Sequence, residues 1–160
     1  MVDIVQTNAL FYKIQNGTVS TIDYINWSQT LLENGVSSPS VNIISSLSFN
    51  ENIFKVEAYF NRALKELALQ KPSYEICARA YIGHLANKNI KENDHTVILD
   101  LAYMIFRIVS VDLRYPDDLI GWYDISEMID ELQYGDNPLK FNKEEVITRI
   151  KDEADEYFDK

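Results

Sequence analysis

The stretch HTVILDLAYMIFRIVSV, residues 95–111, decides the fold class of this chain. When it is wound as a helix, apolar side chains occupy nearly every side, and Asp100 and Arg107 are its charged interruptions. A helix that is apolar almost all round is normally buried among other helices, so this segment predicts the central helix of a bundle. Four of its residues are expected to be among the least exposed in the chain: Val97, Leu101, Ile105 and Ile108.

The segments on either side of this helix also carry the helical period of apolar residues, and cap and turn residues separate them. Ser20 and Asp23 match the capping box that opens many helices. Asn16-Gly17, just before them, also fits a hairpin turn. Because the capping box follows at once, we favour a helix, a turn and a second helix.

The sequence contains no run with strand alternation, no fixed-period repeat and no low-complexity linker. Its 160 residues, 46% of them hydrophobic, match one ordinary domain that can bury its own core. The predicted fold is therefore all-α. It is a compact single domain over residues 1–160, an orthogonal or bundle-like array of about seven helices with the apolar helix near residues 95–111 at its centre.

Negative charge is concentrated in the C-terminal part of the chain. Residues 1–111 hold ten acids and nine bases, whereas residues 112–160 hold fifteen acids and six bases, a net of -9 out of the total of -10. This acidic part coincides with two predicted helices, residues 117–133 and 143–158. Segregated charge creates a directional field that attracts cationic partners, which uniform charge does not.

The first acidic helix lies within RYPDDLIGWYDISEMIDELQYGD, residues 114–136, and has an apolar and an acidic side. Ile120 and Tyr123 fall outside the apolar stripe and project toward the acidic side. An aliphatic and an aromatic anchor among carboxylates are typical of a protein-binding hot spot aimed at a basic surface. The predicted partner-binding residues are Asp117, Ile120, Tyr123, Asp124, Glu127 and Glu131.

The same face also has an interpretation as ordinary solvated surface. Acidic residues over the first turn of a helix stabilise its dipole, which gives Asp117 and Asp118 a purely local use. In that case the segment from Tyr134 to Phe141 would cover Ile120 or Tyr123. The sequence leaves both interpretations open.

Signatures of catalysis and metal binding are missing from the sequence. His84 and His95 lie in different segments without metal-ligand spacing, and the single Cys77 falls on an apolar helix face, as a small buried thiol does. There is no Gly-rich phosphate loop, no G-x-S-x-G and no calcium-binding loop. We therefore predict no catalytic residue, no metal and no cofactor. Direct nucleic-acid binding is disfavoured as well, because no basic stripe is present.

The sequence predicts a cytoplasmic protein that does not enter a membrane. Met1 to Ile14 already carries Asp3, Gln6 and Asn8 among its apolar residues, which is unlike a secretory leader. The longest apolar segment, Val97 to Val111, is shorter than a membrane span.

Three segments, NGTVSTIDYINWSQTLLENG, FNENIFKVEAYFNRALKEL and RYPDDLIGWYDISEMIDELQYGDNP, carry a pattern that resembles a group of small, uncharacterised bacterial helical proteins. That resemblance covers most of the chain and implies a helical fold without an assigned activity. In type rather than in motif, the chain is also similar to the acidic immunity proteins that protect a cell from a toxin. The second resemblance implies a protein partner and transfers no residue roles.

The leading hypothesis is a non-enzymatic binding protein, an immunity or antitoxin-like inhibitor whose acidic C-terminal surface blocks a basic toxin such as a nuclease. One alternative is a phage or host regulator that binds another protein. Another is an undetected helical enzyme in which Asp100, Arg107 and His84 line a pocket. A deep polar cleft near those three residues favours the enzyme, and a flat acidic face with an exposed Tyr123 favours the binder.

Overall fold

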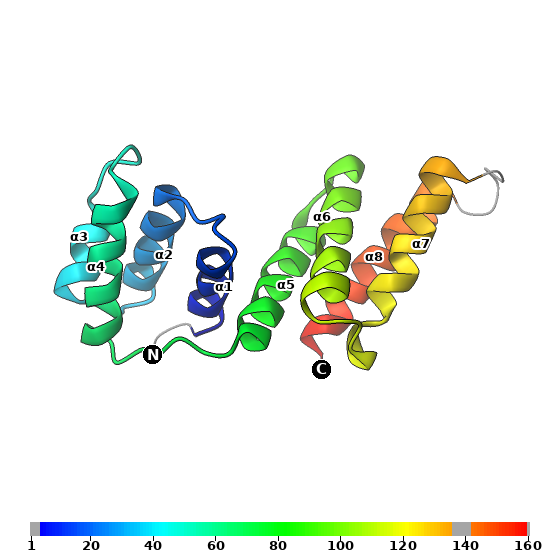
Figure 1. Cartoon of the computed structure of the whole chain (residues 1–160). Coiled ribbons are helices and arrows are strands. Elements are labelled where there is room, and N and C mark those ends of the chain that lie inside the picture. The colour runs from blue at the N-terminus through cyan, green and yellow to red at the C-terminus, as the bar shows by residue number, and fades with distance from the viewer. Residues whose placement is uncertain (1–3, 136–141, 160) are drawn as a thin grey trace. The chain divides into compact units, whose positions relative to one another are not determined.

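The computed structural model describes residues 4–135 and 142–159, and all regular structure in these two ranges is helical (Figure 1). The prediction of an all-α fold is confirmed. The described helices, in chain order, are α1 (Ile4–Gln15), α2 (Thr21–Glu33), α3 (Pro39–Ser45), α4 (Ile53–Glu66), α5 (Tyr74–Lys91), α6 (His95–Arg107), the π-helix η1 (Ile108–Asp112), the 3-10 helix η2 (Asp117–Leu119), α7 (Gly121–Tyr134) and α8 (Lys143–Phe158).

The chain divides into two compact units, residues 1–81 and residues 82–160, and the division falls inside α5. Each unit has its own buried side chains and is described by itself below. Helical sequence continues without interruption through the division, so no linker composition marks it. The prediction of one domain over residues 1–160 stays a prediction.

Unit 1 is built around an aromatic core on α1, α2 and α4. The ring of Phe60 lies within 5.8 Å of Phe11, 5.0 Å of Tyr24 and 4.9 Å of Trp27, measured between ring centroids. The Trp27 indole N–H donates a 3.0 Å hydrogen bond to the Thr7 hydroxyl, so the buried polar end of the ring is satisfied. Edge-on and tilted ring pairs of this kind stabilise helix packing beyond simple area burial.

Helix caps define where the unit 1 helices begin. The Ser20 and Asp23 capping box is present, which confirms a second helix rather than a hairpin after Asn16-Gly17. Ser40, in the first turn of α3, donates from its backbone N–H and its hydroxyl to the Glu66 carboxylate at 2.9 and 2.6 Å. These hydrogen bonds hold the pKa of Glu66 below its ordinary value, and they tie the end of α4 to the start of α3.

In unit 2, α6 packs against both α7 and α8 (Figure 1). Leu101, Ile105 and Ile108 are buried, as predicted, but the prediction for Val97 is wrong because 38% of that side chain is exposed. The exposed residues recur at helical spacing along one side of α6: Val97, Asp100, Met104 and Arg107. The helix therefore has one solvent-facing side, on which the apolar residues Val97 and Met104 alternate with the charged residues Asp100 and Arg107.

Polar contacts hold α8 against its neighbours in unit 2. The Lys151 ammonium donates to the Ile90 and Glu92 carbonyls at 3.2 and 2.8 Å, so it satisfies carbonyl groups at and just beyond the C-terminal end of α5. Glu153 is buried and paired with Arg149 at 2.8 Å. A Cβ atom at Gly121 would meet the Glu153 carboxylate, so any larger residue at the start of α7 requires that side chain to shift.

Truncating the buried Ile105 side chain should destabilise the protein, because it leaves a cavity among α6, α7 and α8. We expect Ile105→Ala to lower the free energy of unfolding by about 2–5 kcal/mol. Val97→Ala, on the exposed side of the same helix, is the matched control and should change it by less than about 1 kcal/mol. Denaturant unfolding of both variants measures the difference, and equal losses would contradict the assignment of the two sides.

Candidate functional site

The position of α7 is fixed by one fully buried stripe. Trp122, Ile125 and Ile129 are at most 2% exposed, and the helix packs against α6 and α8. Because successive residues of a helix are separated by about 100°, burial of this stripe turns the opposite side of α7 toward solvent. Three of the predicted partner-binding residues lie on that exposed side: Tyr123, Asp124 and Glu127.

Five of the six predicted binding residues are exposed: Asp117, Ile120, Tyr123, Asp124 and Glu127. Ile120 and Tyr123 expose 45% and 38% of their surface. Glu131 differs, since it is half-buried and its carboxylate lies against Gly135 at the end of α7. The alternative in which Tyr134 to Phe141 covers this face involves residues 136–141, which lie outside the described ranges.

Tyr123 belongs to a group of four rings, which we call the aromatic cluster: Tyr103, Phe106, Tyr115 and Tyr123. Phe106 lies at its centre, with ring centroids 5.5 Å from Tyr103, 6.5 Å from Tyr115 and 6.3 Å from Tyr123. Tyr115 and Tyr123 are themselves 5.9 Å apart, edge to face. The cluster joins α6, the turn after η1 and the first turn of α7, and its Tyr115 and Tyr123 rings face solvent.

A left-handed backbone conformation at Arg114 and Tyr115 places the Tyr115 ring in this cluster. Arg114 and Tyr115 both have positive φ angles, 56° and 58°, in the left-handed region that side chains with a Cβ disfavour. The Tyr115 N–H donates a 2.9 Å hydrogen bond to the Val109 carbonyl, which anchors the turn to the π-helix. Strained non-glycine residues and π-helical turns are both enriched at functional sites.

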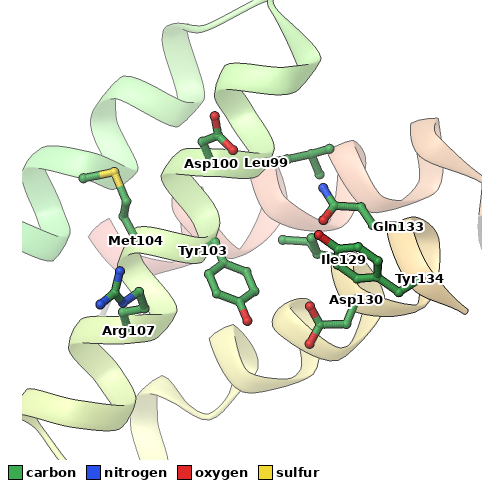
Figure 2. Close-up of a pocket in the computed structure, with 9 residues that line it drawn as sticks. All are labelled: Leu99, Asp100, Tyr103, Met104, Arg107, Ile129, Asp130, Gln133 and Tyr134. Carbon is green, nitrogen blue, oxygen red and sulfur yellow. The ribbon is translucent and has the colours of Figure 1, made fainter.

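An open groove of about 460 Å³ runs between α6 and α7 and adjoins the aromatic cluster (Figure 2). We call it the α6/α7 groove. Tyr103 lines it and also packs on Phe106, so the groove and the cluster form one continuous surface. Its lining comprises Leu99, Asp100, Tyr103, Met104 and Arg107 from α6 and Ile129, Asp130, Gln133 and Tyr134 from α7.

The polar side chains of this groove have no partners among the described residues. No hydrogen bond or ion pair is found there for the side chains of Asp100, Arg107, Asp130 or Gln133. Unpaired charged groups in a concave, partly apolar surface are available to a ligand.

Unit 2 also carries nearly all of the net charge. Residues 82–160 contain eighteen acids and nine bases, a net of -9, and residues 1–81 contain seven acids and six bases, a net of -1. The aromatic cluster and the α6/α7 groove therefore lie in a strongly negative unit, whose field attracts cations.

The chemistry expected of an enzyme is only partly assembled. Asp100 and Arg107 line the same groove, as the enzyme alternative predicted, but His84 is an exposed residue of α5 and is not part of the lining. Cys77 is buried in unit 1, and burial raises the pKa of its thiol, which disfavours the reactive thiolate. In the part of the chain that the structure describes, no three His, Cys, Asp or Glu residues are grouped as a metal site.

Sequence analysis missed three of the four aromatic cluster residues and one of the two acids of the groove, Asp130. Tyr103 and Phe106 are spaced three apart, which puts them on one side of α6, but they were absorbed into an apparently all-round apolar helix. Tyr115 lies directly before Pro116. Its left-handed conformation has no sequence signal, because residues before proline favour extended backbone.

No family model, curated protein or solved structure matches the chain. Among the described helices, none combines the length and the apolar character that crossing a membrane requires.

Replacing Arg114 by glycine should stabilise the protein, because glycine adopts positive φ without a Cβ clash. Arg114 is exposed and makes no ion pair within the described residues, so the substitution removes no ion pair that would offset the gain. We expect Arg114→Gly to raise the free energy of unfolding by about 1 kcal/mol in denaturant titrations. A loss of stability would show that the turn is not held in the left-handed conformation.

Proposed function

We propose that this chain is a non-enzymatic binding protein that uses the aromatic cluster and the acidic face of α7 to bind a basic protein partner. The observation that carries the proposal is the exposure of Tyr115, Ile120 and Tyr123 beside Asp124 and Glu127. Tyrosines contribute large contact areas at low entropic cost and are enriched in binding hot spots. Carboxylates around them supply a polar rim.

The charge of unit 2 supports a cationic partner in particular. A net charge of -9 in 79 residues speeds encounter with a basic surface and disfavours nucleic acid and acidic proteins. Charged rim residues mainly set the association rate and specificity, whereas packed aromatic side chains mainly set the dissociation rate. The two kinds of residue can therefore be tested separately.

Within this class, we favour an immunity or antitoxin-like inhibitor of a basic toxin such as a nuclease. Enzymes that act on nucleic acids need cationic active surfaces, and an anionic protein can occupy such a surface with fast, steered association. A regulator that binds another protein in a phage or its host would use the same surface. The identity of the protein partner distinguishes the inhibitor from the regulator.

An enzyme is the competing class, and the placement of Asp100 and Arg107 in one groove favours it. General acid–base or nucleophilic catalysis requires a reactive group oriented by a neighbour, and the polar side chains of the groove make no such hydrogen bond in the described structure. The binding interpretation accounts for the exposed rings of Tyr115 and Tyr123, whereas the enzyme interpretation does not.

Affinity capture from cells of the source organism identifies the partner when parent and variant proteins are compared. The parent chain should retain a basic protein that the double variant Asp124→Lys, Glu127→Lys loses. A control variant with the same charge change on α8, Asp155→Lys with Glu156→Lys, should retain it. Equal capture by all three proteins would place the interface elsewhere.

Charge reversal on α7 should slow binding of the captured partner. We expect Asp124→Lys with Glu127→Lys to lower the association rate constant at least about tenfold at low salt and to flatten its salt dependence. Surface plasmon resonance at two salt concentrations measures both effects. If the α8 control variant slows association equally, the association rate depends on the total charge of the protein and not on this face of α7.

Removal of one exposed ring should act on dissociation instead. Tyr123→Ala is expected to raise the dissociation rate constant about tenfold while the association rate constant changes little. Because the ring also contacts Phe106 and Tyr115, the unfolding transition of the variant must be measured alongside. An unchanged dissociation rate in a folded variant would exclude Tyr123 from the interface.

A further inference from the structure

The α6/α7 groove contains a carboxylate that is half-buried and has no partner among the described residues. Asp130 makes no hydrogen bond or ion pair with any described residue. Two shielded acids elsewhere in the chain are paired, since Asp23 lies 3.0 Å from Lys13 and Glu153 lies 2.8 Å from Arg149. Asp130 is therefore placed to receive a donor from outside the chain.

Aromatic side chains flank this carboxylate. Figure 2 shows Tyr103 pointing from α6 toward Asp130 on α7, with Gln133 and Tyr134 farther along the same helix. Tyr134 is 81% exposed, so most of its surface is not covered by the described residues. A carboxylate beside tyrosine rings combines charge pairing with cation–π contact, which suits an organic cation.

We infer that the α6/α7 groove receives an arginine side chain of the protein partner, paired with Asp130 and stacked on Tyr103. The inference rests on the proposed binding of a basic protein and names the chemistry that this protein must present. The guanidinium group is planar, bonds a carboxylate through two parallel N–H donors and stacks on aromatic faces. The groove, at about 460 Å³, has room for such a side chain.

The α6/α7 groove is continuous with the aromatic cluster, which favours an arginine of a protein partner over a free small cation. Tyr103 belongs to both surfaces, so an arginine seated on its ring lies beside Phe106, and residues next to that arginine reach Tyr115 and Tyr123. A single partner surface can then fill the groove and cover the exposed rings. The buried Leu99 and Ile129 side chains provide an apolar floor for the arginine methylenes.

Replacing Arg107 distinguishes an arginine ligand from a zwitterionic or anionic one. The Arg107 guanidinium lies on the far side of Tyr103 from Asp130 in Figure 2 and is unpaired in the described structure. Toward an incoming arginine it is a like charge, so its removal should strengthen binding. Toward a ligand that carries a carboxylate or phosphate it is the anchor, so its removal should weaken binding.

The test titrates the isotope-labelled full-length protein with the peptide acetyl-Gly-Arg-Gly-amide at low salt and follows amide signals by NMR. The matched probe is the same peptide with citrulline, which keeps the shape and loses the charge. We expect the arginine peptide to shift the signals of Tyr103, Asp130 and Gln133 with saturation, and the citrulline peptide to leave them in place. Equal shifts with both peptides would overturn the inference.

Three variants extend the test. Asp130→Asn should weaken arginine peptide binding at least fivefold, and Asp155→Asn, the same change on an exposed α8 acid, should leave it unchanged. Arg107→Gln should strengthen it. The inference fails if Asp130→Asn binds like Asp155→Asn, or if Arg107→Gln weakens binding.

The captured partner separates failure of this inference from failure of the proposed function. If Asp124→Lys with Glu127→Lys slows association of the partner while Asp130→Asn binds it like the parent, the proposed function stands and the arginine site is wrong. If the arginine peptide binds at Asp130 but no basic protein depends on α7, the groove binds guanidinium and the proposed protein interface is wrong.

Discussion

Burial of the Trp122, Ile125 and Ile129 stripe is the constraint on which the site depends. Apolar area removed from water contributes roughly 25 cal/mol for each Å², so three fully buried large side chains hold α7 in one rotational setting. With that setting fixed, the helical period leaves Tyr123, Asp124 and Glu127 no position except the surface. Packing on the buried side of α7 thus determines which of its residues form the exposed face.

The same packing creates the groove and supports the strained turn. Because α6 and α7 lie side by side and run in opposite directions, Phe106 meets Tyr123 at one end while Leu99 and Tyr134 line the groove at the other. The connection between them, residues 108–120, turns through two left-handed residues that present Tyr115 to its neighbours. Packing and strain together place exposed rings within the most negative part of the chain.

The sequence predicted the helices and their local features better than it predicted which other parts of the chain cover them. Capping at Ser20 and the buried stripe of α7 follow from local spacing, which a single sequence contains. The exposure of Val97 does not, because the residues that cover a helix come from elsewhere in the chain. Asp130 was counted as one of many acids, and only the structure shows that it lines a groove and makes no pair within the described residues.

The most direct test of the central claim, that the aromatic cluster contacts a basic protein, is site-specific photo-crosslinking in cells. A photoreactive phenylalanine analogue replaces Tyr115 or Tyr123 in unit 2, and replaces Phe54, which is 74% exposed in unit 1, as the control. The account predicts that both unit 2 positions crosslink to the same basic protein and that Phe54 does not. Crosslinking to that protein from Phe54 alone, or from none of the three positions, would contradict it.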